Sequence, residues 1–134
     1  MSKYRHWWRP SVERDIRAYP ALKQKKAELQ KVSVVPVYGG QPVRGSDIGR
    51  TTENAALRQL PQREDAIVNA VEAAIREVSR QRDGKEVLSI VEKVDFKRTH
   101  TIEGVALTMH MDRRTVLRRR NRFLYIVAEK EGYL

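Results

Sequence analysis

Thr101-Ile-Glu-Gly-Val-Ala-Leu-Thr-Met-His-Met-Asp-Arg-Arg-Thr-Val-Leu-Arg-Arg-Arg-Asn-Arg122 is the stretch that decides the expected fold of this chain. Its second half, from Asp112 onward, carries six arginines and a single acid, and its first half has apolar residues at helical spacing. A basic helix alone is common, so the segment before it matters as much. Together the two halves predict a helix-turn-helix at about residues 101–122.

The ends of the two helices are also predicted by this stretch. Thr101 can cap the first helix, because its side-chain oxygen can accept a hydrogen bond from the first turn. Ala106 is the small residue that lets two crossing helices approach closely, and Met111 is expected to close the turn as an apolar plug. Asp112 is then the expected cap of the second helix, whose buried face begins at Val116.

The second helix is expected to have a buried side and an outward side, at about 100° per residue. The stem of Arg119 should lie along the protein, with its guanidinium group at the rim. The buried stripe contains Val116, Phe123 and Val127, with Arg119 and Arg120 at its edges. The outward side carries Arg114, Arg118, Asn121 and Tyr125, flanked by Leu117 and Arg122. The six arginines are therefore not equivalent.

Such a helix is expected to bind double-stranded DNA through its outward side. In the major groove, arginine binds guanine with two hydrogen bonds and leucine can contact a thymine methyl group. The residues expected to contact base edges are Arg113, Arg114, Leu117 and Arg118. The residues expected to contact phosphates are Thr101, Arg120, Asn121 and Arg122. A solvated basic face without a partner is the alternative interpretation of the same arginines.

The positive charge of the chain favours negatively charged partners. The 134 residues carry a formal net charge of +10, and such a surface concentrates polyanions, including nucleic acid and anionic membrane. Residues 1–31 hold nine basic and three acidic side chains, and residues 101–134 hold seven and four. Residues 61–100 balance at eight of each. This distribution is typical of a DNA-binding C-terminus on a neutral scaffold.

Other classes of function are not expected. The chain has no cysteine, and His6, His100 and His110 lack the spacing of a metal site. Neither a catalytic carboxylate pair nor a phosphate-binding glycine loop stands out, so no enzyme, catalytic residue, metal or cofactor is predicted. The N-terminus lacks a signal core and no apolar run approaches the roughly 20 residues of a membrane span. We therefore expect an intracellular protein without a membrane partner.

The predicted fold class is all-α, with the chain divided into three parts. Residues 1–31 are expected to form an N-terminal aromatic and basic helical segment, whose helix breaks or restarts at Pro20. Residues 32–50 contain two prolines and four glycines and are expected to be a linker. Residues 51–134 are expected to be the helical DNA-binding domain. Within it, helices are predicted at about 51–60, 62–81 and 85–96, before the helix-turn-helix.

Two groups of side chains outside the arginine run need an interpretation. Tyr4, His6, Trp7 and Trp8 are interpreted as a hydrophobic anchor onto the protein itself or a partner, in preference to base stacking. RNA polymerase is one partner that these aromatic residues would suit. The acids Glu64, Asp65, Glu72 and Glu77 are expected to form a solvated helix face that pairs with Arg63, Arg76 and Arg80.

Several stretches carry a resemblance to a known family. They are Trp8-Arg-Pro-Ser-Val-Glu-Arg-Asp-Ile-Arg-Ala-Tyr-Pro-Ala-Leu-Lys23, Gly45-Ser-Asp47, Thr101-Ile-Glu-Gly-Val-Ala106, Arg113-Arg-Thr-Val116, Arg120-Asn-Arg-Phe-Leu-Tyr125 and Glu131-Gly-Tyr-Leu134. The chain resembles the RinA-like phage late-gene transcriptional activators, whose C-terminal half is similar to region four of sigma factors. The resemblance covers most of the chain. The chain departs from the family pattern at His110, where a turn glycine is usual, and at Arg119, where an aromatic residue is common.

The resemblance implies promoter-proximal DNA binding in the cytoplasm of a bacterial host cell, with activation of phage structural or packaging genes. One alternative is the small DNA-recognition subunit of a phage packaging motor, which would use the same motif in a ring of subunits. Another is a basic structural or RNA-associated protein without sequence preference, for which binding would depend steeply on salt. Homo-oligomerisation is left open by the sequence.

Overall fold

A computed structural model describes residues 6–34 and 60–134, and within these ranges the chain is helical, without strands. The expected all-α class is therefore confirmed for this part of the chain. The elements are α2 (Arg9–Val34), α4 (Gln62–Ser79), α5 (Gly84–Val91), the π-helix η1 (Glu92–Phe96), α6 (Ile102–Thr108) and α7 (Arg113–Lys130). No helix among the described residues is long and apolar enough to cross a membrane.

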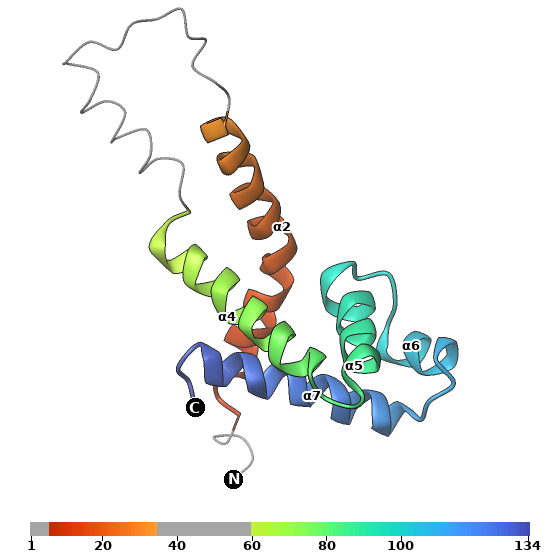
Figure 1. Ribbon diagram of the computed structural model, residues 1–134. Coiled ribbons are helices and arrows are strands. Elements are labelled where there is room, and N and C mark those ends of the chain that lie inside the picture. Colours follow the sequence, from red (N-terminus) through yellow and green to blue (C-terminus); the bar gives the residue numbers. More distant parts are fainter. Residues whose placement is uncertain (1–5, 35–59) are drawn as a thin grey trace, which may run out of the picture.

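The helices pack around one main core. In Figure 1, α2 and α4 lie side by side, α7 crosses below them, and α5 and α6 lie towards one end. The core takes its buried residues from the N-terminal segment, Leu60, α4, α5 and α7. Its largest fully buried side chains are Trp8, Phe123, Ile16 and Leu124. The N-terminal helix and the C-terminal helices therefore share a hydrophobic core, and the expected division into domains stays a prediction.

The helix α2 runs without a break through Pro20, so the expected break there is wrong. Proline removes its own amide donor and crowds the carbonyl four residues earlier, which usually kinks or ends a helix. Here Ile16 and Tyr19 are buried before the proline, and Leu22 and Leu29 pack against the same core after it. Packing on both sides of Pro20 offsets the lost hydrogen bond and keeps the helix continuous.

The helix predicted at about 62–81 agrees with α4 to within a few residues, and two other segments differ from the prediction. The helix α2 extends to Val34, past the expected start of the linker at residue 32. The predicted segment 85–96 is an α-helix that ends as the π-helix η1. The rest of the predicted linker, and the helix predicted at 51–60 apart from its last residue, lie outside the described residues.

The acids of α4 pair with other helices and not with arginines of their own helix, so that expectation is wrong. Glu64 pairs with Lys25 at 3.2 Å, Asp65 with Lys26 at 3.0 Å and Glu77 with Lys130 at 2.9 Å. The fourth acid, Glu72, accepts a hydrogen bond from the Tyr19 hydroxyl at 3.2 Å. Burial, together with Glu72, raises the pKa of Tyr19 to about 12. These contacts fasten α4 to α2 and α7.

The turn between α4 and α5 depends on Gly84. A Cβ atom at this position would overlap the carbonyl oxygen of Val78, which belongs to the rigid last turn of α4. The same oxygen accepts a hydrogen bond from the Gln81 amide at 2.9 Å, and Gln81 in turn accepts one from Gly84 at 3.1 Å. Only glycine fits this close approach of the two helices.

A second, smaller core holds α6 in place. Ile90 of α5, Val105 and Ala106 of α6 and Val116 of α7 are buried together. Met111 packs against this cluster from the turn, as the sequence predicted. The exposed side of α7 is thus held in position by apolar contacts behind it.

Candidate nucleic-acid interface

The helix α6 begins as the sequence predicted. The Oγ1 atom of Thr101 accepts a hydrogen bond from the Gly104 amide at 3.0 Å, and Glu103 lies in the first turn. The acid is favourable there because the N-terminus of a helix carries partial positive charge. The Thr101 hydroxyl is exposed and retains its hydrogen for donation to another group.

The turn between α6 and α7 closes through a backbone motif. The Met111 amide donates to the carbonyl of Ala106 at 2.9 Å, and the His110 amide donates to the carbonyl of Leu107 at 3.4 Å. This pair of bonds is a Schellman motif, which requires a left-handed residue after the helix. His110 takes that conformation, with φ of 54°. The histidine therefore stands where glycine is most favourable.

Asp112 occupies the N-cap position of α7, but only half of the expectation for it holds. Its backbone is extended, with φ of −67° and ψ of 144°, as an N-cap residue requires. Its carbonyl accepts the hydrogen bond of the Val116 amide at 3.1 Å. The carboxylate makes no capping hydrogen bond to the first turn. Asp112 therefore marks the start of α7, but its carboxylate does not bond the free backbone amides of the first turn.

The N-terminal half of α7 presents arginines to solvent. Arg113, Arg114 and Arg118 are exposed, and Leu117 between them is half-buried. The Nε of Arg113 lies 2.8 Å from Glu103 of α6, and this hydrogen bond lowers the pKa of the Glu103 carboxyl. Within the described residues, Arg114 and Arg118 have no acidic partner. Two cationic side chains are thus free to meet an anion, and a third is held only by an exposed ion pair.

Arg120, expected to contact phosphate, is instead buried in the core, so that expectation is wrong. Its guanidinium group donates two hydrogen bonds to Asp95 of η1, at 2.7 and 2.9 Å, and one to Glu13 of α2 at 3.3 Å. Asp95 is only 1% exposed. Burial alone would lower the pKa of Arg120, but the bonds to Asp95 and Glu13 raise it above its usual value. This arginine joins three helices and cannot reach a ligand.

The other residues expected at phosphates are partly engaged with the protein. The amide oxygen of Asn121 accepts a hydrogen bond from Arg9 at 2.9 Å. Arg122 bonds Asp83 of the α4–α5 turn at 2.7 Å and lowers the pKa of that carboxyl. Both side chains are half-buried and keep some exposed surface. Arg119 lies against the same turn, as expected for a stem along the scaffold, and pairs with Asp83 and Glu86.

The aromatic residues before α2 divide into a buried anchor and an exposed surface. Trp8 is 1% exposed and belongs to the main core, whereas Trp7 is 62% exposed and lies edge-on to Tyr133. His6 lies edge-on to Tyr125, on the outer side of α7. The interpretation as an anchor onto the protein itself thus holds for Trp8. Tyr4 lies outside the described residues.

A pocket of about 240 Å³ lies near the C-terminus of α7. It is lined by Asp15, Arg63, Ala66, Ile67, Lys130, Glu131 and Tyr133. Burial, with a hydrogen bond and repulsion from Asp15, raises the pKa of Glu131 to about 8. The Glu131 carboxyl is therefore mainly protonated at neutral pH. Across residues 6–34 and 60–134, no group of three potential ligands is placed to hold a metal ion.

Sequence reasoning missed the role of Asp95, the acid that holds Arg120. The helical phase already placed Arg120 at the edge of the buried stripe, and this was the signal that a buried acid should be sought. It also missed the exposed Leu107, which is 78% accessible on α6.

Comparison with models of protein families, with curated proteins and with solved structures found no match.

Proposed function

We propose that this chain binds double-stranded DNA in a sequence-specific manner, with α6 and α7 acting as a helix-turn-helix. One observation carries the proposal: Arg113, Arg114 and Arg118 are exposed on the N-terminal half of a helix whose other side is buried in two cores. A rigid helix with arginines at its N-terminal end suits insertion into the major groove. A flexible basic tail would offer charge without this fixed orientation.

The residues divide by role in this proposal. Arg114 and Arg118 bind base edges, joined by Arg113 once it leaves Glu103, and Leu117 lies against a thymine methyl group. The phosphate contacts are Thr101, through its free hydroxyl hydrogen, and the exposed parts of Asn121 and Arg122. Phosphate contacts supply most of the affinity, and the base contacts choose the site.

The biological role proposed from the resemblance is transcriptional activation of phage late genes. In this role, the exposed Trp7 of the N-terminal segment is the candidate contact for RNA polymerase. A DNA-packaging subunit would use the same interface. The two roles differ in assembly, since packaging requires a ring and activation requires only a monomer or a dimer.

Selection from a library of random-sequence duplexes tests the proposed function. The full chain should enrich one motif over several rounds, and light scattering of the free protein should report a monomer or dimer. A ring of many subunits would favour packaging over activation. Enrichment of no motif, with affinity that falls steeply with salt on every duplex, would overturn sequence-specific binding.

A further inference from the structure

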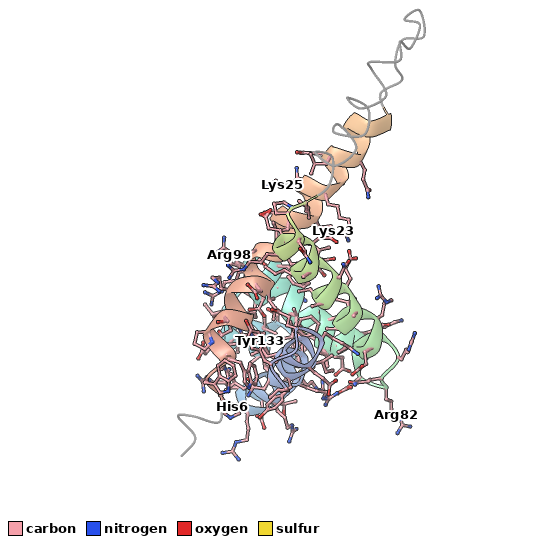
Figure 2. The ribbon with its side chains drawn as sticks, turned by 90° about the vertical axis from the view of Figure 1, so that its left-hand side faces the viewer. His6, Lys23, Lys25, Arg82, Arg98 and Tyr133 are labelled. Carbon is pink, nitrogen blue, oxygen red and sulfur yellow. The ribbon has the colours of Figure 1, made fainter. Side chains whose placement is uncertain are left out.

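A group of exposed cations lies at the end of α4, in the α4–α5 turn and at the start of α5. We call it the basic corner; it consists of Arg76, Arg80, Arg82 and Lys85. All four side chains are exposed, and none has an acidic partner within the part of the chain that the structure describes. Figure 2 shows Arg82 pointing away from the helices at the edge of the molecule.

The acids of the same segment point the other way. Residues 76–86 also contain Glu77, Asp83 and Glu86, and each of these pairs with a cation of α7. Glu77 pairs with Lys130, and Asp83 pairs with both Arg119 and Arg122. The acids therefore fasten the turn to α7, while the four cations face solvent with no acidic partner in residues 6–34 and 60–134. Such a separation of charge makes a surface that attracts anions.

The basic corner lies beside the middle of α7. Arg122, which contacts Asp83 of the turn at 2.7 Å, is one helical turn after Arg118 on the same side of α7. A helix is about 10–12 Å wide and the major groove about 12 Å, so a helix in the groove has a phosphate wall on each side. An element fixed against the flank of α7 would face one of these walls.

We propose that the basic corner is a second DNA-binding element, which contacts duplex phosphates beside the groove that α7 occupies. This inference rests on the proposed function, because it takes the position of the duplex from α7. The turn is suited to the role by its rigidity: Gly84 fixes its path, and two arginines of α7 hold its acids. The contact is to the DNA backbone, so it adds affinity and orientation without reading sequence.

The test measures affinity for a random-sequence duplex as salt is raised from about 50 to about 200 mM, with the full chain. The corner variant is Arg82→Gln/Lys85→Gln. The matched control is Arg17→Gln/Arg63→Gln, which removes the same charge from two exposed arginines that have no acidic partner among the described residues. Arg63 lies at the opposite end of the 18-residue helix α4. Arg76→Gln/Arg80→Gln provides a second corner variant.

Loss of two phosphate contacts should make the slope of log affinity against log salt shallower by about 1.8. Over this fourfold salt range, a corner variant should lose about twelvefold less affinity than the wild-type protein. The control should keep the wild-type slope. Corner variants whose slopes equal that of the control would overturn the basic corner as a contact.

An Arg114→Gln/Arg118→Gln variant separates the two proposals. If it lowers affinity while the corner variants behave as the control does, the proposed contact of α7 with DNA stands and the further inference fails. If it binds as tightly as the wild-type protein while the corner variants weaken binding, the proposed interface on α7 fails. A wild-type protein that binds no duplex overturns both.

Discussion

Replacing Arg120 by alanine should destabilise the protein by about 3–5 kcal/mol, because it leaves a buried carboxylate without its partner. Two hydrogen bonds of 2.7 and 2.9 Å to Asp95 are lost, and the Asp95 side chain is only 1% exposed. The bond to Glu13 contributes less, because Glu13 is partly exposed and keeps Arg9 as a partner at 3.2 Å. The cost therefore comes chiefly from Asp95.

Urea unfolding, followed by circular dichroism and by tryptophan fluorescence, measures this loss. Arg118→Ala is the matched control on the same helix, and as an exposed arginine it should change the free energy of unfolding by less than about 0.5 kcal/mol. A double variant, Asp95→Leu/Arg120→Met, should recover most of the stability lost in Arg120→Ala, because it removes both charges. A loss below about 1 kcal/mol in Arg120→Ala would refute the reasoning.

Three further predictions concern the turns and the C-terminal pocket. Gly84→Ala should cost about 1–3 kcal/mol of unfolding free energy, since its Cβ overlaps a fixed backbone oxygen; a change within about 0.5 kcal/mol in urea unfolding would contradict this. His110→Gly should raise the thermal midpoint, with a gain of up to about 1 kcal/mol, by removing a left-handed side chain; a lower midpoint would count against strain at this turn. The pKa of Glu131 in the folded protein, about 8, lies above its ordinary value of 4.5, so its protonated form contributes stability that is present at acid pH and lost as pH rises through 8. The free energy of unfolding of the wild-type protein should therefore fall between about pH 5 and about pH 9. Glu131→Gln should reduce this fall by about 1–2 kcal/mol, a figure that allows for the partial exposure of Glu131. A variant whose stability has the same pH dependence as the wild-type protein would contradict the raised pKa of Glu131.

The helices α4, α6 and α7 could be predicted because their signals are local. The Thr101 side chain caps α6 by accepting a hydrogen bond from the amide of Gly104, only three residues further along the chain. The apolar face of α7 follows from the helical spacing of its residues. Gly84 lies in the gap between the helices predicted at about 62–81 and 85–96. The outward position of Arg114 and Arg118 follows from the same phase, so the exposed part of the candidate site was also predictable.

The errors arise where a distant part of the chain decides the outcome. Arg120 is buried because Asp95 lies 25 residues away and Glu13 lies 107 residues away in sequence, and no local pattern joins them. The helix through Pro20 is kept by packing on α4 and α7, which its own sequence does not contain. The π-helix η1 turns Asp95 towards Arg120 and Phe96 towards the rings of Tyr19 and Phe123. Spacing alone predicted an ordinary helix there.

The basic corner was missed for a related reason. Local spacing assigned the acids of α4 to arginines of the same helix, which would have neutralised Arg76 and Arg80. In the structure those acids bond Lys25, Lys26 and Lys130 on other helices. The charge left on the surface of a helical protein therefore depends on tertiary ion pairs more than on the order of charges along a helix.

The measurement that tests the central claim most directly compares the affinity of the wild-type protein and Arg118→Ala for a selected duplex and for a randomised duplex at one salt concentration. If Arg118 binds a base edge, the variant loses about 1–3 kcal/mol on the selected duplex and tolerates substitution at one base pair, with a smaller loss on the randomised duplex. Equal losses on the two duplexes would show a phosphate contact at Arg118 and would contradict base reading by the exposed arginines of α7.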